Sequence, residues 1–366
     1  MNELEQARKI INEVDSDMAK LFERRMEAAQ LVAKYKKENA LSILDEAREK
    51  DVIAKNSEMI ENKEIKEYYI EFLKSTMALS RAYQSRLNEG MKVAYCGVPG
   101  AYAYIAAKKM FPDAVYVSYN DFASAYASVE NGECDTAVLP IENSYAGDVG
   151  TVMDLIFSGT LYVNQVIDLA ISHNLIACKG ASVNTVKKVV SHTQALTQCA
   201  EFIKNHGYET EAYANTAMAA EYVKKLNDNS VAAIASDETA KIYDLNILES
   251  SINTSRMNTT RFAAFSRAQN KTDSTKKKMN EHFIIVFTVK NEAGALAKTL
   301  DIIGAHGFNM RNLRSRPMKE LLWNYYFYIE AEGNINTTNG KEMLRELSAT
   351  CARLKLVGTY YSKLEK

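Results

Sequence analysis

Hydrophobic residues near the N-terminus recur at alternating spacings of three and four positions. The stripe runs from Leu4 to Tyr35, and no Gly or Pro interrupts it. This period predicts one long amphipathic helix over residues 3–37, about 50 Å in length. Because so long a helix exceeds what a small helical domain can cover by itself, we expect a second copy of the chain to cover the stripe. The pattern predicts two further helices over residues 44–56 and 63–87.

Beyond Lys92, short runs of apolar and β-branched residues alternate with helical periods, as far as about Arg267. Strands that alternate with helices predict an α/β unit with a mostly parallel sheet, whose ligand sites lie beyond the strand ends. The predicted strands are residues 93–96, 115–118, 137–141, 175–178, 186–191 and 232–235.

A third pattern follows residues 269–281, which are polar, rich in Lys and typical of a solvated linker. Strands are predicted over residues 283–289, 310–316, 325–331 and 355–360, with helices over 293–305 and 341–353. This βαββαβ order is that of a ferredoxin-like sandwich. The chain is therefore expected to be multi-domain, with an all-α domain over residues 1–89, an α/β domain over 91–268 and a βαββαβ domain over 281–362.

Composition narrows the class of protein. At 366 residues the chain is longer than one hydrophobic core usually serves. Its 45 basic and 46 acidic residues leave no basic excess, so we expect no nucleic-acid partner. The five cysteines are odd in number and scattered, which favours reduced thiols and neither metal nor cofactor. No signal segment and no run of roughly 18 apolar residues occurs, so a cytoplasmic protein without membrane contact is expected.

Arg25 interrupts the apolar stripe of the first helix, where a charge is costly unless it is paired. Lys36 lies about 20° around the same helix, so both cations point into one interior space that suits an anion. Arg8 lies about 100° away and several turns earlier, and is expected to serve a second pocket or the partner's pocket. The alternative is that Arg25 pairs with a carboxylate in a polar seam.

The second and third predicted helices add polar residues at helical spacing. Asp45, Arg48 and Glu49 share one face, as do Ser80 and Gln84. Residues 1–88 thereby resemble the all-helical chorismate mutase family. The positions that carry the resemblance are Arg8, Asp15, residues 23–25 and 32–36, Asp45, Arg48, Glu49, Ser80 and Gln84.

The resemblance implies a role for each of these groups toward chorismate. Its carboxylates and ether oxygen would be held by Arg8, Arg25, Lys36 and Arg48. Its hydroxyl would be bound by Asp45 and Glu49, of which Glu49 also shares the ether site. Ser80 and Gln84 would complete the pocket. The rearrangement is unimolecular, so clamping the substrate in its reactive conformer suffices. Arg25, Lys36 and Glu49 are the expected catalytic residues.

Two polar runs stand out in the middle of the chain, residues 140–144 after a predicted strand and 258–262 before an apolar run. Turn chemistry or an edge strand is the alternative for each. Together they resemble prephenate dehydratases over residues 92–267, a family with a two-lobed α/β fold. The matching residues are Thr260, Arg261 and Phe262, residues 141–144 with Gly147, Ser191 with His192, and Thr216 with Ala219 and Ala220.

By that family's pattern, Thr260 donates a hydrogen bond or proton to the departing hydroxyl of prephenate. Arg261 or its surroundings hold a carboxylate, and Phe262 shapes the pocket. Further substrate contacts are implied for Asn143, Ser144, Ser191 and Thr216. The glycine-rich opening of the family carries hydroxyl residues, whereas this chain has Ala101 and Ala103, for which we expect no substrate role.

Residues 281–361 resemble the ACT family of small-molecule regulatory domains. The implied effector is L-phenylalanine, bound at a helix N-terminus and across a dimer seam. The expected effector-binding residues are Gly294, Ala295, Leu296, Asn309, Arg314, Ser315, Arg316 and Pro317. In the phenylalanine-binding version the second motif begins with glutamate, but this chain has Arg314. The alternative is a purely structural dimer module.

The three resemblances together imply a bifunctional enzyme of L-phenylalanine biosynthesis, both an isomerase and a lyase. It would convert chorismate to prephenate and prephenate to phenylpyruvate without a cofactor or metal. Feedback by L-phenylalanine and a homodimer, or a multiple of dimers, are expected. Two alternatives stay open, an arogenate dehydratase activity in the middle domain and a non-catalytic amino-acid sensor.

Overall fold

The computed structural model describes residues 2–255, 257–270, 279–318 and 324–363. The chain divides into two compact units. One is Met1–Lys92 with Asp113–Val115, and the other is Val93–Pro112 with Tyr116–Lys366. The three expected domain boundaries stay a prediction. No helix in the described residues is long and apolar enough to cross a membrane.

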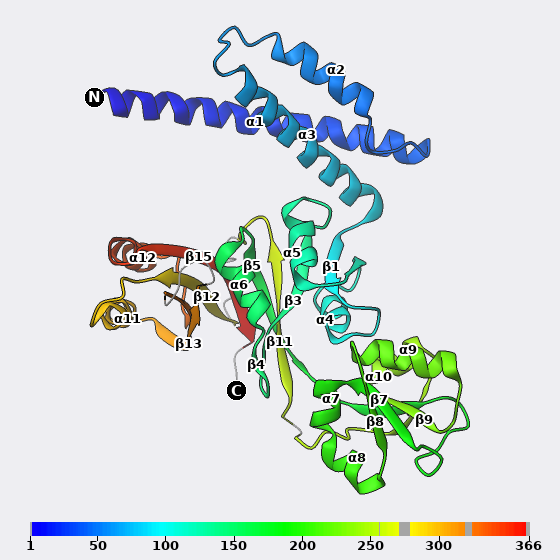
Figure 1. Cartoon of the computed structure of the whole chain (residues 1–366). Helices are drawn as coiled ribbons and strands as arrows, with labels where there is room; N and C mark the ends of the chain where they lie inside the picture. The colour runs from blue at the N-terminus through cyan, green and yellow to red at the C-terminus, as the bar shows by residue number, and fades with distance from the viewer. Residues whose placement is uncertain (1, 256, 271–278, 319–323, 364–366) are drawn as a thin grey trace. The chain divides into compact units, whose positions relative to one another are not determined.

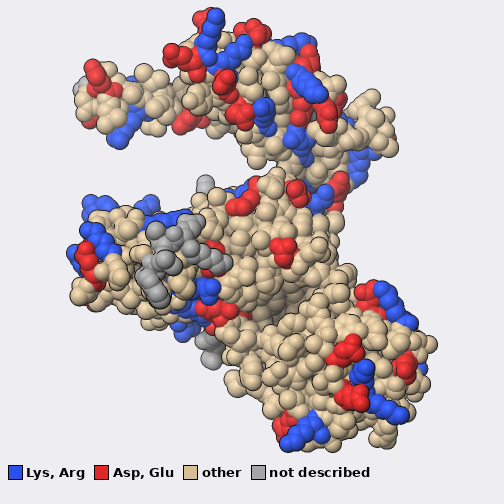
Figure 2. All heavy atoms as spheres, in the orientation of Figure 1, with Lys and Arg blue, Asp and Glu red and all other residues tan. Residues whose placement is uncertain are grey.

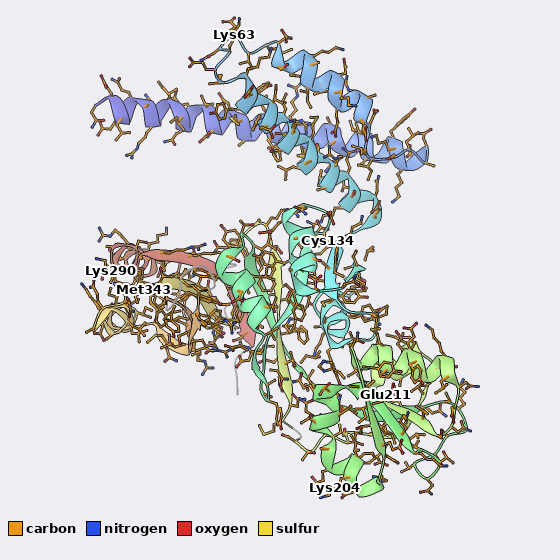
Figure 3. All side chains as sticks on the ribbon, viewed as in Figure 1. Lys63, Cys134, Lys204, Glu211, Lys290 and Met343 are labelled. Atoms are coloured by element: carbon orange, nitrogen blue, oxygen red, sulfur yellow. The ribbon has the colours of Figure 1, made fainter. Side chains whose placement is uncertain are left out.

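The first unit contains three helices, as predicted from the sequence (Figure 1). Asn2 and Glu5 form a capping box at the start of the first helix, each side chain accepting the other's backbone N–H at 2.8 and 3.0 Å. Lys63 lies in the connection between the second and third helices (Figure 3). The helices are α1 (Glu3–Glu38), α2 (Glu46–Ser57) and α3 (Lys66–Glu89).

The N-terminal half of α1 extends past α2 and α3 (Figure 1). In the C-terminal half, Ala29 and Ala33 are buried, and the Asn88 amide of α3 donates to the carbonyl of Ala33 at 3.2 Å. The apolar stripe stays exposed within this unit. Its exposed members are Leu4, Ile11, Val14, Met18, Leu21, Val32 and Tyr35.

The larger sheet of the second unit has the order β13-β14-β12-β15-β5-β11-β3-β1-β2, with β4 beside β3. It is mixed, not mostly parallel as expected: β1 and β3 are parallel, but β11 runs antiparallel to both β3 and β5. The reason is that the chain leaves this sheet after β5 and returns to it in β11. Its first strands are β1 (Lys92–Cys96), β2 (Val115–Tyr119), β3 (Thr136–Asn143), β4 (Gly147–Asp148), β5 (Tyr162–Ala170) and β11 (Thr259–Ser266), and the helices are α4 (Tyr102–Met110), α5 (Phe122–Glu130) and α6 (Gly150–Ser158).

The smaller sheet forms a second lobe with the strand order β10-β6-β9-β7-β8. Strand β7 is parallel to β8 and β9, whereas β6 is antiparallel to β9 and β10. Its strands are β6 (Asn174–Ala177), β7 (Lys188–His192), β8 (Glu209–Tyr213), β9 (Val231–Ala235) and β10 (Asn246–Glu249), and its helices are α7 (Thr193–Gln198), α8 (Ala200–His206), α9 (Thr216–Leu226) and α10 (Asp237–Ile242).

The C-terminal segment has the predicted βαββαβ order. Met343 is fully buried in its core, among Phe283, Ile285 and Ile329 (Figure 3). Most of the predicted linker, residues 271–278, lies outside the described residues. The elements are β12 (Met279–Thr288), α11 (Ala295–Ala305), β13 (Asn309–Pro317), β14 (Tyr325–Glu332), α12 (Thr338–Thr350) and β15 (Arg353–Lys363).

One strand contact joins this C-terminal segment to the first strands of the larger sheet. Strand β15 pairs with β5 in parallel at a single position, Gly358 opposite Val163. A Cβ atom at Gly358 would overlap the backbone of Val163, so only glycine permits this approach. The four C-terminal strands therefore extend the larger sheet.

Candidate active sites

A cavity of about 350 Å³ lies among α1, α2 and α3. It gathers seven residues that the sequence placed in one pocket, and it adds an apolar wall that sequence reasoning did not identify. The predicted residues are Arg25, Lys36, Asp45, Arg48, Glu49, Ser80 and Gln84, and the apolar ones are Ala28, Ala29, Val32, Ile43, Val52 and Met77.

The two cations of α1 are held by neutral oxygen atoms. Arg25 donates to the Ser80 hydroxyl at 2.6 Å and to the carbonyl of Thr76 at 3.4 Å. Lys36 donates to the carbonyl of Ile43 at 2.5 Å. Burial lowers the pKa of Arg25 from its ordinary value. Since none of these three acceptors carries a charge, neither cation is neutralised by them, and both can pair with an anion in the cavity.

The residues of α2 are already engaged with one another or with α3. Asp45 caps α2 by accepting the backbone N–H of Arg48 at 3.0 Å. The Arg48 guanidinium pairs with Asp51 at 3.1 Å, and Glu49 pairs with Arg81 of α3. Arg81 was missed from the sequence, where its face of α3 gave no signal. The Glu49–Arg81 pair ties α2 to α3 beside the cavity.

Gln84 contributes a buried acceptor with no partner. Its side chain lines the cavity, the residue is 8% exposed, and its Oε1 finds no hydrogen-bond partner in the described part of the chain. A buried oxygen without a donor costs about 1–3 kcal/mol. This cost would be relieved by a ligand hydroxyl.

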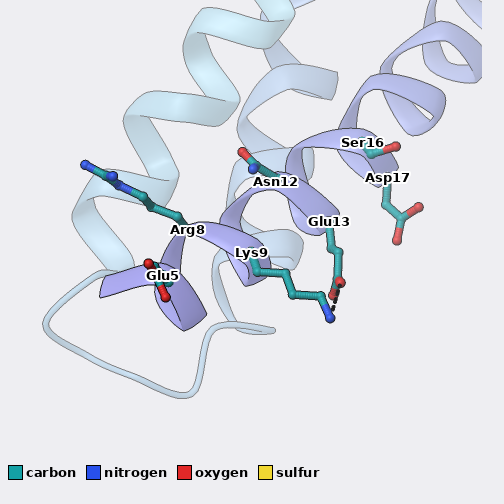
Figure 4. Close-up of a pocket in the computed structure, with 7 residues that line it drawn as sticks. All are labelled: Glu5, Arg8, Lys9, Asn12, Glu13, Ser16 and Asp17. Carbon is teal, nitrogen blue, oxygen red and sulfur yellow. Dashed lines mark ion pairs between the residues drawn. The ribbon is translucent and has the colours of Figure 1, made fainter. Parts of the chain in front are cut away.

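Arg8 does not reach this cavity within one chain. It lies 17 residues before Arg25 on the same helix, which is about 25 Å along the axis. It borders an open surface hollow on α1, where Lys9 and Glu13 form an ion pair at 4.0 Å (Figure 4). A contact of Arg8 with a cavity of this kind therefore requires a second copy of the chain.

A second cavity, of about 220 Å³, lies between the two sheets of the second unit. Three of its residues, Asn143, Thr216 and Thr260, were predicted from the sequence. Ala101, for which no substrate role was expected, also lines it. The remaining lining residues are Tyr102, Ile171, His173, His192, Gln194, Ala195, Gln198, Ala214, Asn215 and Asn258.

Asn143 holds the threonine of this cavity. Its Nδ2 donates to the Thr260 hydroxyl at 2.8 Å and to Oδ1 of Asn258 at 2.9 Å. Its Oδ1 accepts the backbone N–H groups of Tyr145 and Ala146 at 3.0 and 2.9 Å. Because Thr260 Oγ1 accepts from Asn143, its own proton is directed elsewhere and can be donated to a ligand.

A buried network of His173, Gln198 and Tyr102 forms another wall, which sequence reasoning missed. His173 Nε2 lies 2.9 Å from Gln198 Oε1, and its Nδ1 lies 3.2 Å from the Tyr102 hydroxyl. Burial lowers the pKa of His173, so the imidazole is neutral at neutral pH. The Gln198 Nε2 is buried without a partner in the described residues. No motif spacing links these positions, which the fold alone brings together.

Four predicted residues lie outside the second cavity. Ser144 donates to the carbonyl of Met257 at 3.0 Å, and Ser191 donates to that of Ile234 at 2.6 Å. Phe262 is buried in the core, at 2% exposure. Arg261 binds Glu330 of β14 with two bonds of 3.1 and 3.2 Å. In this structure these four residues support the strands that carry the site.

The two cavities differ in charge. Among the described residues, no Lys, Arg, Asp or Glu lines the second cavity, whereas five charged residues line the first. Acidic and basic side chains are interspersed over the helical unit in the view of Figure 2. The first cavity is thus suited to clamp an anion by charge, and the second to bind through neutral hydrogen-bonding groups.

In the part of the chain that the structure describes, the predicted effector residues do not share one cavity. Leu296 borders a small cavity of about 120 Å³ with Tyr325 and Phe327, and Pro317 borders another beside α6. Gly294 precedes α11 with φ 83°, a conformation that favours glycine. Asn309 donates to Glu332 at 3.0 Å. The predicted set also includes Ala295, the first residue of α11, and Ser315, which is exposed on β13.

The two arginines of the second effector motif face strands β3 and β4 and helix α6. Arg314 pairs with Glu142 and Asp148, and Arg316 approaches Asp154 of α6 at 3.4 Å. Neither guanidinium lines a cavity with Leu296. Within the described residues of one chain, this set therefore does not form a single effector cavity.

Two family models match the sequence. Prephenate dehydratase matches residues 93–270, and chorismate mutase type II matches residues 7–85. A bifunctional chorismate mutase/prephenate dehydratase of Buchnera aphidicola is 30% identical over 96% of this chain and 95% of its own length. An arogenate dehydratase/prephenate dehydratase 2 of Arabidopsis thaliana is 33% identical over 74% of this chain and 72% of its own.

The fold of the second unit also has a solved counterpart. The crystal structure of prephenate dehydratase from Arthrobacter aurescens, in complex with L-Phe, has a TM-score of 0.68 and 24% identity. It covers 74% of this chain and 90% of its own. These matches confirm the predicted fold class, with a helical domain followed by α/β lobes and a C-terminal mixed sheet.

Proposed function

The chain belongs to the family of bifunctional chorismate mutase/prephenate dehydratases, and we propose that its two cavities are the two active sites. The enzyme converts chorismate to prephenate and prephenate to phenylpyruvate in L-phenylalanine biosynthesis. One observation carries the assignment of the sites. Each cavity, built within a single unit, gathers side chains that the family's motifs imply.

The helical cavity would act by positioning and charge. Arg25 and Lys36, whose partners are neutral, bind the carboxylates and the ether oxygen of chorismate, and Arg48 rotates from Asp51 to join them. Asp45 and Glu49 accept the hydroxyl. The rearrangement breaks a C–O bond and forms a C–C bond within one molecule, so no nucleophile or base is required. Cations at the ether oxygen stabilise the charge that develops there.

The test of this site is Arg25→Ala in the full chain. Mutase turnover should fall at least roughly a hundredfold, since the substrate loses a half-buried cation. Arg24→Ala is the matched control, because Arg24 is exposed on the same helix and lies outside the cavity. Near-normal turnover of the Arg25 variant would remove the assignment.

The second cavity would act through Thr260. Its hydroxyl, oriented by Asn143, gives its proton to the departing ring hydroxyl of prephenate, which leaves as water. The carboxylate leaves as CO2, and its electron pair completes the aromatic ring. The Thr260 oxygen then regains a proton from water. Aromatisation of the ring drives the loss, so a weak acid in the correct place is sufficient. Thr216 and the neutral amides of the cavity hold the substrate. Phe262, Ser144 and Ser191 act by shaping the strands around it.

Thr260→Ala tests this role. We expect dehydratase kcat to fall at least roughly a hundredfold, the usual contribution of a positioned proton donor. Thr259→Ala serves as the control, since that side chain does not line the cavity. Phenylpyruvate formation by Thr260→Ala at the parental rate would contradict the proposal.

Prephenate is the substrate that the attached mutase supplies. The Arabidopsis relative carries both arogenate and prephenate in its name, so the aminated substrate is the second candidate. The comparison of kcat/KM for the two substrates decides between them, and a higher value for arogenate would reassign the second cavity.

We propose L-phenylalanine as the effector of the C-terminal βαββαβ segment, through the predicted residues at 294–296, 309 and 314–317. Dehydratase rate measured against added L-phenylalanine tests this, with D-phenylalanine as the control. An unchanged rate would favour a purely structural module.

A homodimer is supported by the exposed stripe of α1 and by the distance of Arg8 from its own chain's cavity. We further propose a cytoplasmic location, which the five unpaired cysteines support.

A further inference from the structure

Two adjacent residue pairs of strands β3 and β11 lie between the second cavity and the C-terminal strands of the larger sheet. Thr260 is opposite Asn143, and Arg261 is opposite Glu142. The first pair lines the cavity. Because side chains alternate along a strand, the second pair leaves the opposite face, where the two charged groups lie 3.8 Å apart. Thus Glu142, which precedes Asn143, and Arg261, which follows Thr260, both point away from the cavity.

Strands β13 and β14 place side chains of opposite charge against Glu142 and Arg261. Glu330 of β14 is 3% exposed and accepts from Arg261 and, at 2.5 Å, from the Tyr360 hydroxyl. Burial lowers the pKa of Arg261, but Glu330 and Tyr360 outweigh it and raise that pKa above the ordinary value. Arg261 therefore stays charged and fixed on the C-terminal sheet.

Arg314 of β13 makes the second connection. Its guanidinium pairs with Glu142 at the end of β3 and with Asp148 of β4. These two carboxylates are themselves opposite one another in the β3–β4 hairpin. The side chains of all three are at most 27% exposed, so water screens their interaction only in part. Charges of alternating sign therefore run from Arg314 through Glu142 and Arg261 to Glu330.

The positive charge at position 314 suits the two carboxylates that it faces. The phenylalanine-binding ACT motif that the segment resembles has glutamate there. In this chain a glutamate would place a third carboxylate against Glu142 and Asp148, whereas arginine pairs with both. In this structure the side chain expected to serve an effector is paired with the β3–β4 hairpin of the dehydratase site.

We propose that Arg314 is a positioning residue for the dehydratase reaction. By holding Glu142 and Asp148 together it fixes the β3–β4 turn, whose backbone N–H groups bind Asn143 and set its amide against the Thr260 hydroxyl. Arg314 does not line the cavity, so it acts through the hairpin. This role rests on the proposed assignment of Asn143 and Thr260 to the dehydratase site.

Arg314→Gln in the full chain tests the role, because it removes the charge and keeps hydrogen-bond donors. Dehydratase kcat should fall roughly tenfold or more with a smaller change in KM, since misplacement of a catalytic group mainly affects the chemical step. Mutase activity, measured on the same sample, should stay within about twofold and reports that the helical unit is intact. Arg314→Lys should restore part of the loss. Arg311→Gln is the matched control, as Arg311 lies on the same strand and pairs with Glu332 of the C-terminal segment at 2.9 Å.

A second set of variants shows whether Arg314 acts through the two carboxylates. In a Glu142→Gln/Asp148→Asn background, adding Arg314→Gln should change dehydratase kcat by less than about twofold, because the charges it would balance are gone. An undiminished loss in that background overturns the proposal, and so does a parental rate for Arg314→Gln alone. Equal losses in Arg311→Gln, or loss of mutase activity as well, would assign Arg314 a general structural role and also overturn it.

Thr260→Ala in the same series separates this inference from the site assignment. If Thr260→Ala is inactive and Arg314→Gln is normal, the positioning role alone fails. If Thr260→Ala keeps the parental rate, the cavity is not the dehydratase site and the proposed function fails first.

Discussion

The unpaired oxygen of Gln84 gives the helical cavity a measurable cost. Replacing Gln84 by Met keeps the length of the side chain and removes the buried acceptor. We expect the free energy of unfolding to rise by about 1 kcal/mol, since an unsatisfied polar group is lost. The same variant should lose mutase activity roughly tenfold or more, because the ligand contact is lost with it. Urea denaturation followed by circular dichroism and the mutase rate are the two measurements.

Opposite signs for stability and activity are what distinguish a ligand-binding oxygen from a structural one. If Gln84→Met is less stable than the parent, the oxygen has a partner in the folded protein and the reasoning is wrong. Gln30→Met is a suitable control, as Gln30 is exposed on α1 and does not line the cavity.

Lys355, which contacts the C-terminal end of α6, should make the free energy of unfolding depend on pH. Its ammonium donates to the carbonyls of Ile156, at 2.9 Å, and Gly159, and burial with a smaller effect of Arg353 lowers its pKa from 10.5 to about 8. Between those two values the unfolded chain holds the proton and the folded chain has released it. This group therefore makes the free energy of unfolding rise with pH from about 8 to 10.5, and contributes no slope below that window.

Lys355→Met should abolish that slope. The difference in free energy of unfolding between parent and variant, from urea denaturation at pH 8 and pH 10, should shift in favour of the parent at the higher pH. A difference that is the same at both pH values would show that Lys355 titrates normally.

Among the helices, α1 leaves a long apolar stripe exposed that a partner chain could cover. It has 36 residues, about 54 Å, yet only Ala29 and Ala33 are buried. Leu21, in the middle of the stripe, is 63% exposed. Leu21→Lys should shift the protein from dimer to monomer in light scattering and lower mutase activity with it, because Arg8 then loses the partner's cavity.

The control for that change lies on the opposite side of the helix. Glu23 is about 200° from Leu21 and exposed, so Glu23→Lys should leave the molar mass unchanged. A Leu21→Lys dimer with normal mutase activity would argue that the stripe is covered in another way.

Local pattern predicted the elements of the helical unit and of the βαββαβ segment well, but it missed strands β5, β8, β10 and β11 of the α/β region and said little about strand pairing. The helix bounds at α1 and the βαββαβ order followed from periodicity and from the placement of Gly and Pro. Nothing local predicted that β11 would run antiparallel between β3 and β5, or that Gly358 would bring β15 against Val163. Strand partners far apart in sequence are selected by packing, which leaves no periodic signal.

The same limit applies to the sites. Arg25 was predicted because it breaks the pattern of an amphipathic helix, and Lys36 because it lies near Arg25 around the same helix. Asp45, Arg48 and Glu49 were predicted from their shared helix face and from the family resemblance. His173 and Gln198 were missed because a buried polar residue on a loop or short helix breaks no pattern. Arg261 and Arg314 were assigned to ligands from motif positions, while the structure engages both in ion pairs between β-strands.

For the whole molecule, the division into two units has a consequence for the order of the two reactions. All residues that line the helical cavity belong to the first unit, and all those that line the second cavity belong to the other. No lining residue is shared, so each reaction should proceed when the other site is disabled. Prephenate that leaves one molecule should be usable by another.

A mixture of Arg25→Ala and Thr260→Ala proteins tests this. Fed with chorismate, the mixture should form phenylpyruvate after a lag during which prephenate accumulates in solution, because the intermediate must pass between molecules. The lag should shorten as the Arg25→Ala protein, which supplies the intact dehydratase site, is increased. Absence of phenylpyruvate, with both single activities intact in separate assays, would mean that prephenate does not exchange with solution. In that case the two cavities function only within one molecule.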